Sequence, residues 1–101
     1  MSLTKGSRLY VRIDYWIGEK EFSNQDLQDH LLYAEKVAGE RYFVGGGFSN
    51  TGGGMILLKA DNLEEAQRIA QNDPIIEKGF FRYELYEWEP LILSENVVGG
   101  E

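Results

Sequence analysis

Residues 9–17 read LYVRIDYWI, and this stretch decides the predicted fold because two kinds of side chain alternate along it. One side is fully apolar and consists of Leu9, Val11, Ile13, Tyr15 and Ile17. The other side mixes aromatic with charged groups and consists of Tyr10, Arg12, Asp14 and Trp16. A period of two is typical of a β-strand. We therefore predict a strand over 9–17 that packs its apolar side on a hydrophobic core.

Two amphipathic helices are predicted further along the chain. Ser23 or Asn24 could cap the first, and its apolar positions recur at helical spacing: Leu27, Leu31, Ala34 and Ala38. Asn62, with Asp61 before it, could cap the second helix. That helix should end before Pro74, because the residue preceding a proline disfavours helical backbone. Residues 74–78 read as one further helical turn.

Three more strands complete the pattern, at 41–44, 55–60 and 80–88. Between the first two lies a connection, 45–54, that contains six glycines. The order is the ferredoxin-like βαββαβ pattern, an α+β sandwich of a four-stranded antiparallel sheet with two helices on one face. We assign the domain to 8–90 and treat 91–101 as a C-terminal tail that could act as a dimer-swapping arm.

The second face of such a sheet would remain uncovered. Its predicted occupants are large aromatics mixed with charged groups: Tyr10, Trp16, Phe80, Tyr86 and Trp88, with Arg12, Asp14, Arg82 and Glu84. An apolar patch of this size is unusual on a monomer. We therefore expect a homodimer whose sheets pack face to face or close into a barrel, with Arg12 and Asp14 in its polar network. The alternative is that loops and the tail cover the face within one chain.

Composition excludes several classes of function. The chain has 101 residues, 17 acidic against 10 basic, for a net charge of -7, so phosphate-rich nucleic acids would be repelled. It has no cysteine and one histidine, so neither a disulfide nor a thiolate zinc site can form, and we predict no metal and no cofactor. No apolar run is long enough for a membrane span or a signal peptide. We expect a cytoplasmic protein that binds no membrane.

The predicted topology gathers candidate site residues at one end of the domain. His30 on the first helix should meet Asp73 at the end of the second, and Trp16, Gly46, Gly47 and Phe80 should form the surrounding rim. A carboxylate that orients a histidine gives a general acid or base. Each residue also has a plain structural explanation. His30 could be a packed core residue, and Asp73 could simply cap the helical turn that starts at Pro74.

The glycine-rich connection is a weaker signal. It lacks the Gly-Lys-Ser/Thr ending of a phosphate-binding loop, and it leads into a strand instead of a helix. We interpret it as a flap over the rim or as a wide turn.

Several segments together resemble the YciI-like (YCII-related) family. They are His30-Leu31-Leu32-Tyr33, the glycine connection after Val44, Leu63-Glu64-Glu65-Ala66, and the run from Asn72-Asp73-Pro74 to Gly79-Phe80-Phe81. The resemblance implies the dimeric α/β barrel fold and a pocket with a histidine–aspartate pair, here His30 and Asp73. This sequence departs from the family in having Leu27 where many members have arginine, and Gly46-Gly47 where many have Gly-Pro.

Three functional hypotheses follow. The leading one is a small cofactor-free enzyme of the lyase, isomerase or hydrolase type, in which His30 and Asp73 act on a small-molecule substrate. The alternative is a non-catalytic small-molecule-binding or assembly module with the same dimeric fold. The third is a monooxygenase of the same superfamily that uses oxygen directly.

Overall fold

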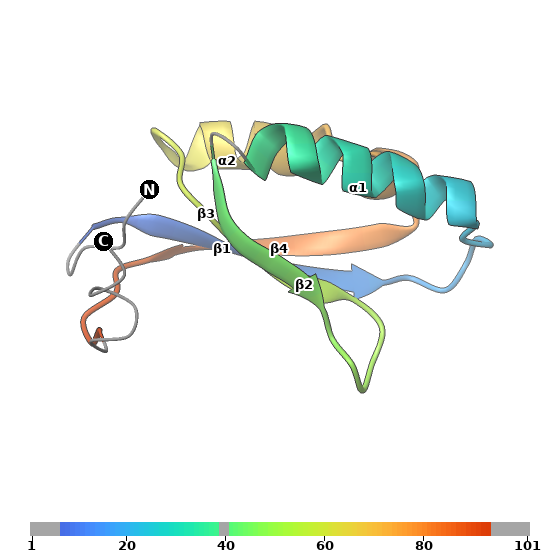
Figure 1. The fold of residues 1–101 in the computed structure, drawn as a ribbon, viewed down its shortest axis with the longest axis horizontal. Coiled ribbons are helices and arrows are strands. Elements are labelled where there is room, and N and C mark those ends of the chain that lie inside the picture. Colours follow the sequence, from blue (N-terminus) through green and yellow to red (C-terminus); the bar gives the residue numbers. More distant parts are fainter. Residues whose placement is uncertain (1–6, 39–40, 94–101) are drawn as a thin grey trace.

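The computed structural model describes residues 7–38 and 41–93. The elements are β1 (Leu9–Trp16), α1 (Asn24–Ala38), β2 (Tyr42–Gly47), β3 (Gly54–Leu58), α2 (Leu63–Gln71), α3 (Pro74–Glu77) and β4 (Phe81–Trp88). The four strands form one antiparallel sheet in the order β2-β3-β1-β4. The helices lie together on one face of that sheet (Figure 1). The predicted α+β, ferredoxin-like architecture is confirmed.

Side chains at the helix ends fix where the helices begin. The Ser23 hydroxyl accepts a hydrogen bond from the backbone N–H of Asp26, and the Asp26 carboxylate accepts from the backbone N–H of Ser23. This reciprocal capping starts α1. Asn62 caps α2 by accepting from the backbone N–H of Glu65 at 2.8 Å. Gly79 follows α3 with a φ of 80°, a conformation that favours glycine.

The glycine connection is shorter than its sequence indicates. Gly45, Gly46 and Gly47 are part of β2 and pair with Ile56, Met55 and Gly54 of β3, so only 48–53 form the loop. The prediction of a loop from 45 to 54 was wrong because backbone pairing needs no side chain. At Gly54 a side chain would even be excluded, since a Cβ there would collide with the carbonyl oxygen of Gly46.

The side of β1 that faces the helices is the opposite of the one that we predicted. Tyr10, Arg12 and Asp14 are buried beneath the helices, and Leu9 is the one buried residue on the opposite side of the strand. Tyr10 belongs to the main core with Ile56, Leu58 and Ala66. The polar side of the strand can face the helices because its charges pair there. Arg12 and Asp14 therefore do not lie on the uncovered sheet face, where we had placed them.

The uncovered face of the sheet is consequently more apolar than expected. Directly opposed residues of neighbouring strands point to the same side. The register opposes Val11 to Leu57 and Tyr86, and opposes Ile13 to Met55. Tyr86 is 48% and Trp88 46% exposed. Those two residues lie where the prediction put them, and so do the charged residues Arg82 and Glu84. Tyr10 and Trp16 point the other way, because their partners Leu58 and Phe81 belong to the helix-facing side.

Little of the predicted tail is described. Leu91 and Ile92 are exposed, and residues 94–101 lie outside the described part of the chain, so the swapping arm stays a prediction. In the part that the structure describes, no helix is both long enough and apolar enough to cross a membrane.

The core assignment predicts that two leucine truncations will differ sharply. Leu58→Ala removes a buried side chain, and we expect the free energy of unfolding to fall by about 2–5 kcal/mol. Leu32→Ala, on the exposed side of α1, should cost less than about 0.5 kcal/mol. Urea denaturation of both variants measures the difference, and equal losses would contradict the assigned core.

Candidate active site

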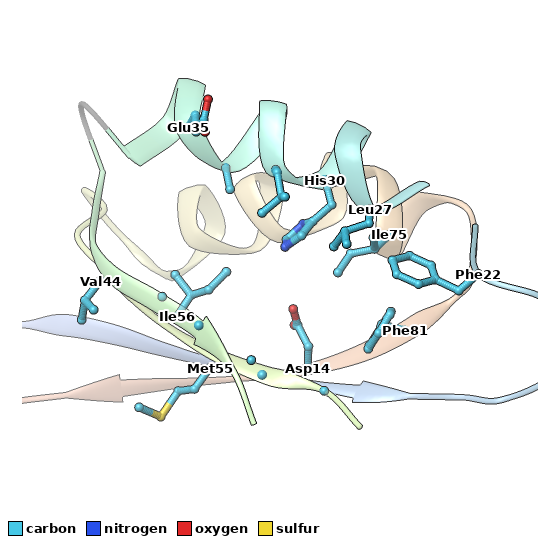
Figure 2. A pocket seen from close by; sticks show the side chains of 17 residues that line it. Asp14, Phe22, Leu27, His30, Glu35, Val44, Met55, Ile56, Ile75 and Phe81 are labelled. Carbon is cyan, nitrogen blue, oxygen red and sulfur yellow. The ribbon is translucent and has the colours of Figure 1, made fainter. Parts of the chain in front are cut away.

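A cavity of about 380 Å³ lies between α1 and the β2–β3 hairpin. Figure 2 shows it with α1 on one side, the hairpin on the other and β1 beneath. Its apolar lining comes from the segment before α1, from α1 itself, from α3 and from the sheet, and includes Phe22, Leu27, Leu31, Ile56, Ile75 and Phe81. Its ionisable lining residues are Asp14, His30 and Glu35. A cavity of this volume, mostly apolar with a few polar groups, has the character of a small-molecule site.

Glycines keep one wall of this cavity open. Gly45 and Gly47 pair with Ile56 and Gly54, which puts their Cα hydrogens on the helix-facing side of the hairpin. Side chains at these positions would project toward α1 and occupy the space. Gly46 and Gly47, which we predicted to contact substrate, both line the cavity.

Asp73 is the centre of a buried network. Its side chain is 0% exposed. One carboxylate oxygen accepts from Nη2 of Arg12 at 3.0 Å, the other accepts from the backbone N–H of Ile75 at 3.2 Å, and both lie 2.9 Å from Nδ1 of His30. Asp73 therefore ties α1, β1 and the start of α3 together. The same carboxylate caps α3 and orients the histidine.

His30 projects from α1 into the cavity, with its ring above Asp14 (Figure 2). Because Nδ1 lies against Asp73, Nε2 is the ring nitrogen available to a ligand. Among the residues that the structure describes, none forms a hydrogen bond with Nε2. The structure thus brings the two predicted residues His30 and Asp73 into contact, and it leaves one nitrogen of the histidine accessible from the cavity.

Arg12 and Asp14 are the site residues that the sequence interpretation missed. Nε and Nη2 of Arg12 donate to the two carboxylate oxygens of Asp14 at 2.7 and 2.9 Å. The pKa of Asp14 is raised above its ordinary value of 3.8, chiefly because the carboxyl is buried, although its hydrogen bonds from Arg12 and the charge of Arg12 act to lower that pKa. The available signal was an opposite-charge pair, two residues apart, inside an otherwise apolar strand. Such charges are buried when they have partners.

The predicted aromatic rim needs correction. Trp16 is 54% exposed and does not line the cavity; it packs beside Gly52 of the loop. Phe80 is buried but does not line the cavity, and its ring centroid lies 5.4 Å from that of Phe22. The aromatic side chains that do line the cavity are Phe22 and Phe81, in edge-to-face contact at 5.6 Å. Strand β4 starts at Phe81, so the phenylalanine we selected is one residue too early.

No group of three or more histidine, aspartate or glutamate side chains suited to a metal ion occurs in residues 7–38 and 41–93.

Comparison with known proteins identifies the family. The model of the YCII-related domain matches residues 9–89, so the chain belongs to the YCII-related family. A curated relative is the uncharacterized protein YjpA of Bacillus subtilis (strain 168), 27% identical over 82 residues that cover 80% of this chain and 96% of YjpA.

A solved structure shares the fold. It is 5-chloro-2-hydroxyhydroquinone dehydrochlorinase (TftG) from Burkholderia phenoliruptrix AC1100, in complex with 2,5-dihydroxybenzoquinone. The TM-score is 0.69 at 20% identity, with 80% of this chain and 93% of that chain covered. At this identity the similarity establishes the fold alone, which is the ferredoxin-like α+β sandwich described above.

The two aspartates Asp14 and Asp26 should titrate on opposite sides of their ordinary value. Carbon-13 NMR of the side-chain carboxyls should give Asp14 a midpoint above 3.8, because burial opposes its charge. Asp26, whose pKa is lowered by hydrogen bonds from Ser23, should titrate below 3.8.

The raised pKa also has a consequence for stability. Folded Asp14 binds its proton more tightly than unfolded Asp14, so its contribution to the free energy of unfolding falls as the pH rises from 3.8 through the folded midpoint. A midpoint for Asp14 at or below 3.8 would show that the pair with Arg12 outweighs burial.

Proposed function

We propose that this protein is a small cofactor-free enzyme in which His30 transfers a proton to or from a small-molecule substrate and Asp73 positions it. One observation carries the proposal: Nδ1 of His30 is held by a fully buried carboxylate, Nε2 has no hydrogen-bond partner among the described residues, and the side chain lines an apolar cavity. A histidine used only for packing would also need a partner for Nδ1, so the cavity beside the ring is what favours the functional role.

The geometry defines the direction of proton transfer. The Asp73 carboxylate accepts a hydrogen bond from the Nδ1–H group of His30. In neutral His30 the lone pair is therefore on Nε2, and this nitrogen acts as the base. After Nε2 takes a proton from the substrate, the carboxylate stabilises the imidazolium. In an elimination the electrons of the broken C–H bond form a double bond as the leaving group departs with its own pair. In an isomerisation the electrons of the broken C–H bond shift the double bond, and the imidazolium returns the proton to another carbon. In a hydrolysis Nε2 takes a proton from water as the water oxygen attacks the substrate, and the leaving group departs with the electrons of its broken bond.

The fold similarity to TftG supports this type of chemistry. That protein is named as a dehydrochlorinase and was solved with a quinone, a small ring compound. We propose that this chain acts on a ring compound of similar size, by elimination, isomerisation or hydrolysis. The binding-module alternative requires a packed histidine and a filled pocket. The open cavity and the accessible Nε2 favour the enzyme.

We also propose that the protein works as a homodimer. The uncovered sheet face carries apolar side chains at Val11, Leu57, Tyr86 and Trp88, beside the charged pair of Arg82 and Glu84. In a two-fold dimer the same patch of both copies forms the interface, so the apolar side chains of this face would cover one another.

Replacing His30 should slow catalysis strongly without unfolding the protein. We expect His30→Ala to slow turnover by about 10²–10⁴-fold, because the general base is lost. Asp73→Asn should also slow turnover, since an amide cannot orient and stabilise the ring in the same way. A suitable assay follows, by NMR in D2O, the loss of substrate and the incorporation of deuterium over a panel of hydroxylated and chlorinated benzenes, together with the release of chloride.

Gln28→Ala is the matched control, because Gln28 is exposed on the same helix and does not line the cavity. It should leave turnover unchanged, and circular dichroism should show all three variants folded. Equal turnover by His30→Ala and the parent would refute the proposed mechanism.

The homodimer is tested by analytical ultracentrifugation at micromolar concentration. The parent should sediment at roughly twice the chain mass of 11.5 kDa. Val11→Arg puts a charge between Leu57 and Tyr86 and should yield monomers, whereas Gln67→Arg on the exposed side of α2 should not. A monomeric parent protein would overturn this proposal.

A further inference from the structure

We propose that the cavity selects neutral or cationic rings bearing a hydroxyl or amino group, that Asp14 binds this group opposite His30, and that carboxylates and phosphates are rejected. The inference rests on the proposed function, because it concerns the ligand of the same cavity. It adds a second side chain in direct contact with the substrate.

The two aspartates of the network have different surroundings. Asp73 is fully buried, and Arg12, His30 and Ile75 already donate to it, so it positions His30 without reaching a ligand. Asp14 lines the cavity, and its carboxyl points from β1 toward the ring of His30 (Figure 2).

The carboxyl of Asp14 retains hydrogen-bonding capacity. Each of its oxygens accepts one hydrogen bond from Arg12. A carboxylate oxygen has two lone-pair sites, so each oxygen could accept one more hydrogen bond. A hydroxyl or amino group on a ligand could supply that donor between Asp14 and Nε2 of His30.

The charges around the cavity disfavour anions. Within the network, one guanidinium faces two carboxylates, which leaves one net negative charge when His30 is neutral. Glu35 adds a further acidic group to the lining. The lining residues include no lysine and no arginine, so a carboxylate or phosphate would meet only like charge and His30. A cationic group on the ligand would balance the network.

The walls fit the ring of the same ligand. Leu27 and Leu31 line the cavity from α1, and Phe22 and Phe81 form an aromatic corner. Apolar and aromatic walls bury a ring, while the acidic floor fixes the orientation of its polar substituent. At position 27 the leucine gives the cavity an apolar wall, where a cation would have attracted an anionic group.

The test uses three probes that share one ring and differ in charge: benzylamine, benzyl alcohol and benzoate. Binding is measured by isothermal titration calorimetry and by the ring resonances of His30, the single histidine of the chain. We expect benzylamine and benzyl alcohol to bind at least about tenfold more tightly than benzoate, and to shift the His30 signals, because a hydrogen bond to a charged group is worth this much. Binding of benzoate as tight as that of the other two, or no binding of any probe, would overturn the proposal.

Asp14→Asn tests the assigned residue. This substitution should weaken the affinity for benzylamine by about tenfold, because the negative charge at the floor of the cavity is lost. It should also reduce the difference in affinity between benzylamine and benzoate. Glu64→Gln, the same kind of change at an exposed position of α2, should leave all three affinities unchanged. An unchanged ranking in folded Asp14→Asn would contradict the role of Asp14. If that variant does not fold, the ranking of the three probes by the parent protein still decides the charge preference.

Binding and turnover separate this inference from the proposed function. The probes report on equilibrium affinity alone, so a preference for benzoate would refute the ligand class while leaving His30 as a candidate base. Loss of the His30 mechanism in turnover assays would leave the affinity ranking intact.

Discussion

The buried guanidinium of Arg12 is the constraint on which the rest of the structure depends. Its side chain is 1% exposed in the middle of the sheet, and a charge so far from water must be paired. Asp14 supplies one carboxylate from the same strand, and Asp73 supplies the other from the junction between α2 and α3. This requirement turns the polar side of β1 toward the helices. It also anchors the connection that holds Asp73 against His30, so the ion network and the candidate base form one unit.

The cavity depends on a second feature, which is the absence of side chains at Gly45, Gly46 and Gly47 in the second half of β2. Glycines at the helix-facing positions of the hairpin let its backbone pair closely with β3 and leave the space beside α1 open. Strand β1 contributes the charged floor of this space and α1 contributes His30. Asp14 on β1 would therefore select the ligand, and His30 on α1 would transfer the proton. A ligand in the cavity would contact both residues.

The sequence carried the order of elements, the capping residues and the proximity of His30 to Asp73, because each follows from local patterns and from chain topology. It could not tell which side of β1 is buried. Periodicity separates Leu9, Val11 and Ile13 from Arg12 and Asp14, but the choice of side depends on a carboxylate sixty-one residues away. The glycines of 45–47 looked like a loop because a strand without side chains has no periodicity. We predicted that the last strand begins at Phe80, but it begins at Phe81. This difference of one residue explains why the ring of Phe81, and not that of Phe80, lines the cavity.

The proton position on His30 is the most direct test of the account. A long-range proton–nitrogen correlation spectrum, recorded in alkaline buffer where the imidazole is neutral, distinguishes the two tautomers. The network predicts the proton on Nδ1, held by Asp73, and a lone pair on Nε2 facing the cavity. The same spectrum of Asp73→Asn should lose this preference. A parent protein with its proton on Nε2 would contradict the account, because the nitrogen assigned as the base would already be protonated.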